Sequence, residues 1–230
     1  MARPKPARLY PASLDLRGVP VLVVGGGAVA ARKAAALLAA QACLTVVAPD
    51  FARAFGALAR QAGLKQVRRP FRASDLQGQT LVFAATDDLA LNRHIADQAR
   101  RRKLWVNVAA PGEAGNLQVP AALWRNSVCV AISTGGASAA LARTLRERVA
   151  QAVGPEWGQL ASLLEARRER ILEQIAEPAA RRGLLRRLAG PHWAARLRRH
   201  GLKRVAREID RLIAQAPRRA TLSPVGRGPT

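Results

Sequence analysis

The residues with the clearest chemical meaning are three consecutive glycines, Gly25 to Gly27, between an apolar run and an alanine-rich segment. Gly25 permits a tight turn, and Gly27 lets backbone N–H groups approach a pyrophosphate. Ala30 is the third small residue, which allows the following helix to pack close to the preceding strand. The N-terminus of that helix then faces the phosphates. The arrangement predicts a dinucleotide site; the alternative is a tight turn with a structural role alone.

An acidic residue after a second strand would complete such a site. Residues 44–48 form an apolar run of that kind, and Pro49 and Asp50 end it. Asp50 could bind the ribose hydroxyls, which would favour NAD over NADP. It lies two residues beyond the usual strand tip, and it could equally cap a helix that begins near Phe51. Both interpretations stay open.

The elements that must position these residues alternate between strand and helix from residue 20 to about 110. This alternation predicts a parallel, doubly wound α/β sheet of the Rossmann type. Ligands bind beyond the carboxyl ends of the strands in such folds, where Thr86–Asp88 and Asn107 also fall. We expect strands at 21–24, 44–48, 66–67, 81–85 and 104–108, and helices at 28–40, 51–62 and 89–102.

Residues beyond 111 change character. Two further strands are expected at 117–119 and 128–132, followed by a small-residue turn at 133–138 and helices up to about residue 214. Helix breaks are expected at Gly154, Gly183, Gly190 and Gly201. We therefore divide the chain into a nucleotide-binding domain at 1–111, a dimerisation region at 112–150, a small helical domain at 151–215 and a disordered tail at 216–230.

The chain is strongly basic, with 38 Lys and Arg against 15 Asp and Glu and a net charge of +23. Such a balance attracts polyanions, although arginines solvated on helix surfaces explain any single residue equally well. We see no signal peptide and no run of 18 apolar residues, so a cytoplasmic protein without a membrane span is expected. Cys43 and Cys129 lie in apolar runs and are expected to be buried thiols.

Three segments together resemble one family: residues 14–33, residues 84–88 with Asn92, and residues 133–138 with 141–143. The chain resembles the precorrin-2 dehydrogenase and sirohydrochlorin ferrochelatase family, which forms the N-terminal module of siroheme synthase. The pair Arg32-Lys33 after the glycines and the Ser/Thr-Gly-Gly-x-Ser turn are not general Rossmann features. The resemblance covers about residues 9–175, and we expect the chain to end where the methyltransferase part of the fused enzyme would begin.

The resemblance implies an NAD-dependent oxidation of precorrin-2 to sirohydrochlorin, and some members also insert Fe²⁺. It implies a homodimer built on exchanged strands and helices of residues 112–150. Carried over by position, the resemblance and the glycine motif assign to the cofactor Gly25, Gly27, Ala28, Val29, Pro49, Asp50, Thr86 and Asn107.

One departure from the family bears on the chemistry. The family has an aspartate three residues after the asparagine of the fifth strand, where this chain has Ala110. Glu113, Asp87 and Thr134 are the remaining candidates for a catalytic group, and none belongs to a metal-ligand pattern. We therefore expect the dehydrogenase reaction without efficient ferrochelatase activity. The alternatives are a bifunctional enzyme that makes siroheme, or a non-catalytic protein that senses or carries a tetrapyrrole or NAD.

Precorrin-2 carries eight carboxylates, which a cleft rich in arginine can pair and attract. Arg125, Arg143 and Arg146 are expected there, beside Thr134 and Ser138 of the small-residue turn. Each arginine could equally be solvated or lie in a dimer interface. A nucleic-acid partner is not expected, because the basic segment 181–230 holds one aromatic residue and no recognisable recognition module.

Overall fold

The computed structural model describes residues 9–110 and 114–216. Contacts within the chain divide it into two compact units. The first unit comprises the described residues up to Pro120 together with Ser133–Ala139, and the second comprises Ala121–Ile132 and the described residues from Ala140 onward. The expected dimerisation region, 112–150, is thus shared between the two units, and its boundaries and those of the other expected domains stay predictions.

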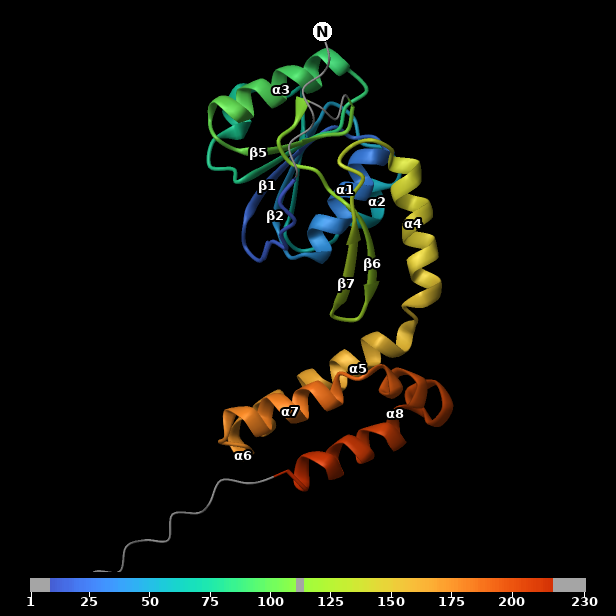
Figure 1. The fold of residues 1–230 in the computed structure, drawn as a ribbon. Coiled ribbons are helices and arrows are strands. Elements are labelled where there is room, and N and C mark those ends of the chain that lie inside the picture. The colour runs from blue at the N-terminus through green and yellow to red at the C-terminus, as the bar shows by residue number, and fades with distance from the viewer. Residues whose placement is uncertain (1–8, 111–113, 217–230) are drawn as a thin grey trace, which may run out of the picture. The chain divides into compact units, whose positions relative to one another are not determined.

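The first unit is built on a parallel sheet of five strands in the order β3-β2-β1-β4-β5 (Figure 1). The expected Rossmann-type topology is therefore confirmed. The register pairs Val21 with both Leu44 and Leu81, so β1 lies at the centre between β2 and β4. The strands are β1 (Pro20–Val24), β2 (Cys43–Ala48), β3 (Leu64–Arg68), β4 (Leu81–Ala84) and β5 (Trp105–Val108).

Helices cover both faces of this sheet because its central strands are apolar on both sides. Val21 and Val23 pack against helices α1 (Ala28–Ala39) and α2 (Phe55–Leu58) on one face. Leu22 and Val24 pack on the other face, against α3 (Leu89–Arg101). Burial on both faces is what a continuous run of apolar residues predicts for a parallel strand.

Two of the expected elements are wrong. The helix expected at 51–62 is the single turn α2, because Ala54 supplies no side-chain cap and Gly56 weakens the turn. The strand expected at 117–119 is irregular. Asn116 and Leu117 both donate to the carbonyl of Val106, so the backbone amides of this segment share one acceptor on β5 instead of forming a ladder.

The second unit combines a β-hairpin with five helices. Strand β6 (Ala121–Arg125) pairs antiparallel with β7 (Val128–Ile132). The helices are α4 (Ala139–Ala152), whose first residue belongs to the first unit, α5 (Pro155–Glu165), α6 (Arg168–Gln174), α7 (Pro178–Leu188) and α8 (Pro191–Ala214). The apolar faces of α5 to α8 meet in one core, which includes Leu160, Ile171, Leu188, Trp193, Val205 and Ile209.

The glycines expected to break helices behave differently from one another. Gly154 and Gly190 each precede a helix that opens with proline, and Gly201 interrupts α8 with φ 73° and ψ 168°. Gly183 lies inside α7 and does not break it. That expectation was wrong because the neighbouring leucines, Leu184 and Leu188, are buried in the core and hold the helix through the glycine.

Two expectations drawn from composition can be compared with the structure. Cys43 and Cys129 are both exposed, so the expectation of buried thiols was wrong. Cys43 is the first residue of β2, and Cys129 takes an outward position of β7. Among residues 9–110 and 114–216, no helix has the length and hydropathy needed to cross a membrane.

The two glycines of α7 and α8 make a matched pair for a stability test. Gly183→Ala should raise the free energy of unfolding by about 0.5–1 kcal/mol, because alanine is the better helix former and a Cβ there meets no described atom within 4 Å. Gly201→Ala should lower it by about 1–3 kcal/mol, because alanine does not tolerate that φ and ψ. Urea unfolding of the two variants measures both, and equal signs would contradict the argument.

Candidate functional site

The turn between β1 and α1 is held against two neighbouring strands by its backbone. The Gly25 amide donates to the carbonyl of Val47 at 2.9 Å, and the residue has φ +125°. A Cβ on Gly25 would collide with the carbonyl oxygen of Ala85, and one on Gly26 would collide with that of Asp50. The glycine turn therefore fits between the ends of β2 and β4 only without side chains.

Gly27 has the opposite environment. A Cβ on Gly27 would have no described atom within 4 Å, and the residue is the N-cap of α1 without a side-chain hydrogen bond to the helix. The first N–H groups of α1, at Ala28 and Val29, donate to no backbone carbonyl of the described residues. Val29 is 40% exposed beside them. Open space at a helix N-terminus fits a pyrophosphate, which accepts hydrogen bonds from such amides.

Asp50, which follows Pro49, lies directly against this turn. The Ala52 amide donates to the carbonyl of Gly26 at 2.8 Å, which ties the loop after β2 to the glycines. Asp50 does not cap α2, since Ala54 is the N-cap of that helix. Its exposed carboxylate makes no hydrogen bond to the described residues. The capping interpretation is therefore wrong, and the ribose interpretation stays a prediction.

Asn92 organises the loop after β4. This side chain is fully buried, and its Oδ1 accepts from the amide and hydroxyl of Thr86 at 3.2 and 2.8 Å. Its Nδ2 donates to the carbonyls of Thr86 and Ala110, each at 3.0 Å. One amide thus joins the loops that follow β4 and β5. Asp88 caps α3 by accepting from Ala90 and Leu91.

The candidate catalytic residues fall into three situations. Asp87 is exposed at the carboxyl end of β4, and its carboxylate has no partner among the described residues. Thr134 is used in its own turn, where its hydroxyl donates to the carbonyl of Ser138 and accepts from the Ser138 amide. Glu113 lies outside the described residues. Ala110 contributes its carbonyl to Asn92 and has no group that transfers protons.

Asn107 is buried near the end of β5 and holds two other segments. Its Oδ1 accepts from Nζ of Lys33 at 2.7 Å, and its Nδ2 donates to the carbonyl of Leu117 at 2.9 Å. Gln118, the next residue, lies against Gly136 of the small-residue turn. The amide of Asn107 therefore connects helix α1 to the segment that supports the turn at 133–138.

Lys33 is half-buried in this arrangement, and its ammonium lies 5.4 Å from the ring centroid of Phe83. Desolvation lowers the pKa of Lys33, and the positive charge of Arg32 lowers it further. The surroundings of Lys33 thus make its charged form less favourable than it would be in water.

The three arginines expected to bind substrate belong to the second unit. The guanidinium of Arg125 donates to the carbonyls of Val153 at 3.0 Å and Ala150 at 3.4 Å, so it caps the end of α4. Arg146 lies 3.7 Å from Glu147. Arg143 is exposed on α4. Arg125 therefore has a structural role, and the substrate contacts of all three stay predictions.

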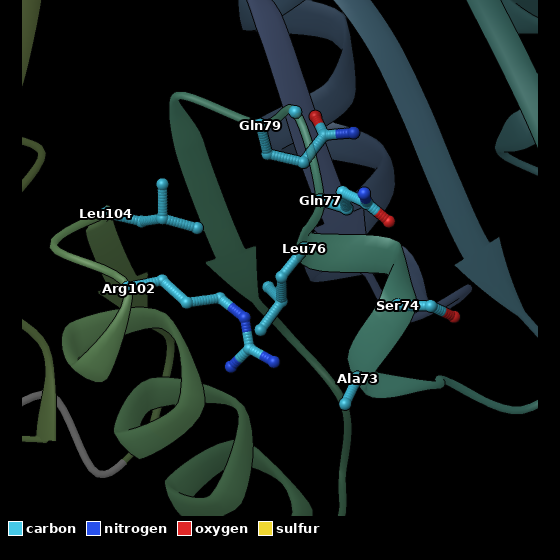
Figure 2. A pocket seen from close by; sticks show the side chains of 8 residues that line it. Ala73, Ser74, Leu76, Gln77, Gln79, Arg102 and Leu104 are labelled. Carbon is cyan, nitrogen blue, oxygen red and sulfur yellow. The ribbon is translucent and has the colours of Figure 1, made fainter.

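A pocket of about 380 Å³ lies elsewhere in the first unit, and Figure 2 shows the side chains around it. Arg102 and Leu104 precede β5, and Gln79 precedes β4, so this pocket opens at the amino ends of the strands. Dinucleotides bind at the opposite edge, which excludes it as the cofactor site. No three His, Cys, Asp or Glu side chains of the described ranges gather as a metal site would require.

Sequence reasoning assigned no role to Gly26, Asn92 or Lys33. The packing role of Gly26 could have been predicted from the glycine run. The phosphate site needs Gly25 and Gly27, so the glycine between them is expected where the backbone packs closely against another segment. The roles of the other two depend on contacts between distant residues: 18 positions separate Asn92 from Ala110, and 74 separate Lys33 from Asn107. No local pattern signals such contacts.

Comparisons with known proteins agree with this geometry. A family model described as putative NAD(P)-binding matches residues 12–121. The siroheme synthase of Methylococcus capsulatus is 40% identical over 207 residues, which are 90% of this chain and 43% of that protein. The siroheme synthase of Gluconacetobacter diazotrophicus is 37% identical over 226 residues, 96% of this chain and 48% of that protein. The chain thus spans less than half the length of these relatives.

A solved structure named SirC, precorrin-2 dehydrogenase, matches 88% of this chain and 100% of its own, with a TM-score of 0.74 and 29% identity. The chain belongs to the precorrin-2 dehydrogenase and siroheme synthase family. In this family member the glycine turn and the loops after β4 and β5 form one edge of the first unit.

The contrast between Gly26 and Gly27 gives a sharp test of the cofactor site. Gly27→Asp should abolish NAD⁺ binding, because a carboxylate would occupy and repel the pyrophosphate site. It should leave the melting temperature unchanged or slightly raised, because aspartate is a good N-cap. Gly26→Ala should lower the melting temperature through its clash with Asp50. Calorimetry with NAD⁺ and thermal unfolding check both, and NAD⁺ binding by folded Gly27→Asp would contradict the assignment.

Proposed function

We propose that the chain catalyses the NAD-dependent oxidation of precorrin-2 to sirohydrochlorin. The observation that carries this proposal is the glycine turn, whose open Gly27 and adjacent Asp50 carboxylate fit a dinucleotide. The likeness to a precorrin-2 dehydrogenase over that protein's whole length supports the substrate. We place the reaction in the cytoplasm, where NAD⁺ is available.

In this proposal each part of the site either binds the cofactor or positions a residue that does. The amides at the start of α1 hold the pyrophosphate, and Asp50 accepts from the ribose hydroxyls. The Asp50 carboxylate also repels the 2′-phosphate of NADP, which favours NAD. Asn92 fixes the loops after β4 and β5, which keeps Thr86 at the strand end. Bound NAD⁺ supplies the hydride acceptor.

The reaction also releases a proton, and the family aspartate is absent at Ala110. Asp87 is the described catalytic candidate that carries a carboxylate, and this carboxylate serves no structural contact with the described residues, whereas that of Asp88 caps α3. We assign it the role of proton acceptor for oxidation, where a general base contributes about 10²–10⁴-fold. Metal insertion needs more, because pyrrole N–H protons must leave while substrate Fe²⁺ loses its water. The chain therefore favours oxidation over chelation.

The position of Ala110 provides the decisive experiment. The purified protein should convert precorrin-2 to sirohydrochlorin with NAD⁺, more slowly with NADP⁺, and should insert Fe²⁺ no faster than the uncatalysed rate. Ala110→Asp should raise chelation more than oxidation, because it restores a base and a metal-binding oxygen. Absorbance follows both reactions, compared at equal NAD⁺ occupancy so that a binding change is not taken for chemistry.

Two outcomes would overturn parts of this proposal. Efficient iron insertion by the unmodified protein would mean that Glu113 or another group replaces the aspartate, and that the protein is bifunctional. Neither oxidation nor chelation, with tetrapyrrole binding retained, would favour a non-catalytic sensor or carrier. The absence of a proton-transferring side chain at Ala110 is the observation that keeps this second candidate function in view.

We also propose that the protein is a homodimer that uses the β6–β7 hairpin. One face of this hairpin packs on α5 through Leu123, which is buried. The other face is apolar and exposed: Trp124 is 63% exposed and stands opposite exposed Cys129. A hairpin of two strands is marginal by itself, and no third strand joins it within the described chain. A second copy of the hairpin would cover this face.

Trp124→Glu tests the dimer. The glutamate should shift the protein toward monomer, because it would place a charge in the apolar contact. Leu202→Glu is the matched control, since Leu202 is also an exposed apolar residue of the second unit but lies on α8. Light scattering at micromolar concentration measures the mass. A monomeric unmodified protein, or equal effects of the two substitutions, would contradict the proposal.

A further inference from the structure

Lys33 is a charged group for which the structure and the proposed reaction so far give no use. It lies on α1, the helix that begins at the glycine turn, and reaches across the Phe83 ring to Asn107. Asn107 is one residue from the end of β5. The ammonium therefore lies near the carboxyl ends of the strands, the edge that carries the cofactor loop.

The ammonium has no opposite charge among the described residues. An ammonium has three N–H donors, and one described acceptor, Oδ1 of Asn107, takes one of them. The groups that face it from β4 and β5, Phe83 and Asn107, are uncharged. The charge that acts on it is that of Arg32 on its own helix, which is also positive. A half-buried cation in these surroundings is stabilised by any anion that reaches it.

Two other partly buried cations of this protein, Arg69 and Arg167, differ from Lys33 in one respect. Arg69 pairs with Asp75, and Arg167 pairs with Asp210 at 2.8 Å. In both cases the protein supplies the carboxylate and the cation serves the fold. The described residues supply none for Lys33, although it is comparably shielded. This contrast indicates that the opposite charge comes from a ligand.

We propose that Lys33 is a substrate-binding residue, whose ammonium receives a carboxylate of the tetrapyrrole at the carboxyl edge of the sheet. The inference rests on the proposed function, which supplies a substrate with eight carboxylates. Asn107 holds the ammonium in place, and the binding of the anion removes the cost of a desolvated, uncompensated charge. Such pairing is strengthened because burial has already removed part of the water around the ammonium.

The test compares Lys33→Met with Arg32→Met, a neighbouring exposed residue of the same charge. Calorimetry measures the Kd of sirohydrochlorin, a stable product with the same carboxylates, and separately the Kd of NAD⁺. Lys33→Met should raise the Kd of sirohydrochlorin by about tenfold or more. It should change the Kd of NAD⁺ by less than about twofold and reduce the salt dependence of sirohydrochlorin binding. Arg32→Met should leave the Kd of sirohydrochlorin within about threefold of the unmodified value.

The melting temperature distinguishes substrate binding from a structural role. Removing an uncompensated charge should leave the melting temperature of Lys33→Met unchanged or raise it. If Lys33 instead served the fold, the substitution would lower the melting temperature. Glu113, outside the described residues, is tested as an internal partner by Glu113→Gln. Equal falls in Lys33→Met and Glu113→Gln that do not add in the double variant would identify an internal ion pair and overturn the proposal.

Failure of this inference can be told from failure of the proposed function. Equal affinity of the unmodified protein and Lys33→Met for sirohydrochlorin would overturn the role of Lys33 while leaving the dehydrogenase intact. No binding of sirohydrochlorin and no oxidation of precorrin-2 by the unmodified protein would overturn both.

Discussion

The close approach of the glycine turn to two backbone carbonyls is the constraint on which the rest of the first unit depends. The carbonyls of Ala85 and Asp50 occupy the space that side chains on Gly25 and Gly26 would need. Because these two positions carry no side chains, the turn packs between the ends of β2 and β4. Helix α1 therefore begins at the carboxyl edge of the sheet. This placement leaves Gly27 as the residue that faces outward, so packing and phosphate access are divided between adjacent glycines.

Side-chain amides hold in place the loops and segments that the hydrogen bonds of the sheet do not reach. Asn92 joins the loops after β4 and β5, Asn107 joins α1 to the segment at Leu117, and Asn116 bonds the backbone of β5. Each of these amides uses both its oxygen and its nitrogen, so each fixes one orientation of its neighbours. The carboxyl edge is thus shaped by amides that donate and accept, while Asp87 and Asp50 stay available for ligands.

The sequence indicates the parts of this design that are local. The β-branched run of β1 and the glycines after it predict strand, turn and helix because each depends on neighbours within a few residues. Helix α2 was overestimated because apolar periodicity does not show a missing cap. The irregular segment at 117–119 escaped prediction because its contacts with β5 are not a ladder: the Leu117 amide donates to the carbonyl of Val106, and the Leu117 carbonyl accepts from the Asn107 side chain. The same limit applies to the site. The glycine run predicts the role of Gly27, whereas the role proposed for Lys33 depends on its contact with the distant residue Asn107.

Net charge is a poor guide to where an anion binds in this protein. The basic second unit pairs Asp210 with two arginines, and the hydrogen bond from Arg167, followed by that from Arg170, holds the pKa of Asp210 below its ordinary value. Arg125 uses its guanidinium on the carbonyls at the end of α4. The protein itself supplies hydrogen-bond acceptors for these three arginines. Lys33 differs because burial removes part of its water while the described protein supplies no carboxylate. That imbalance, more than charge alone, identifies a place where a ligand gains by binding.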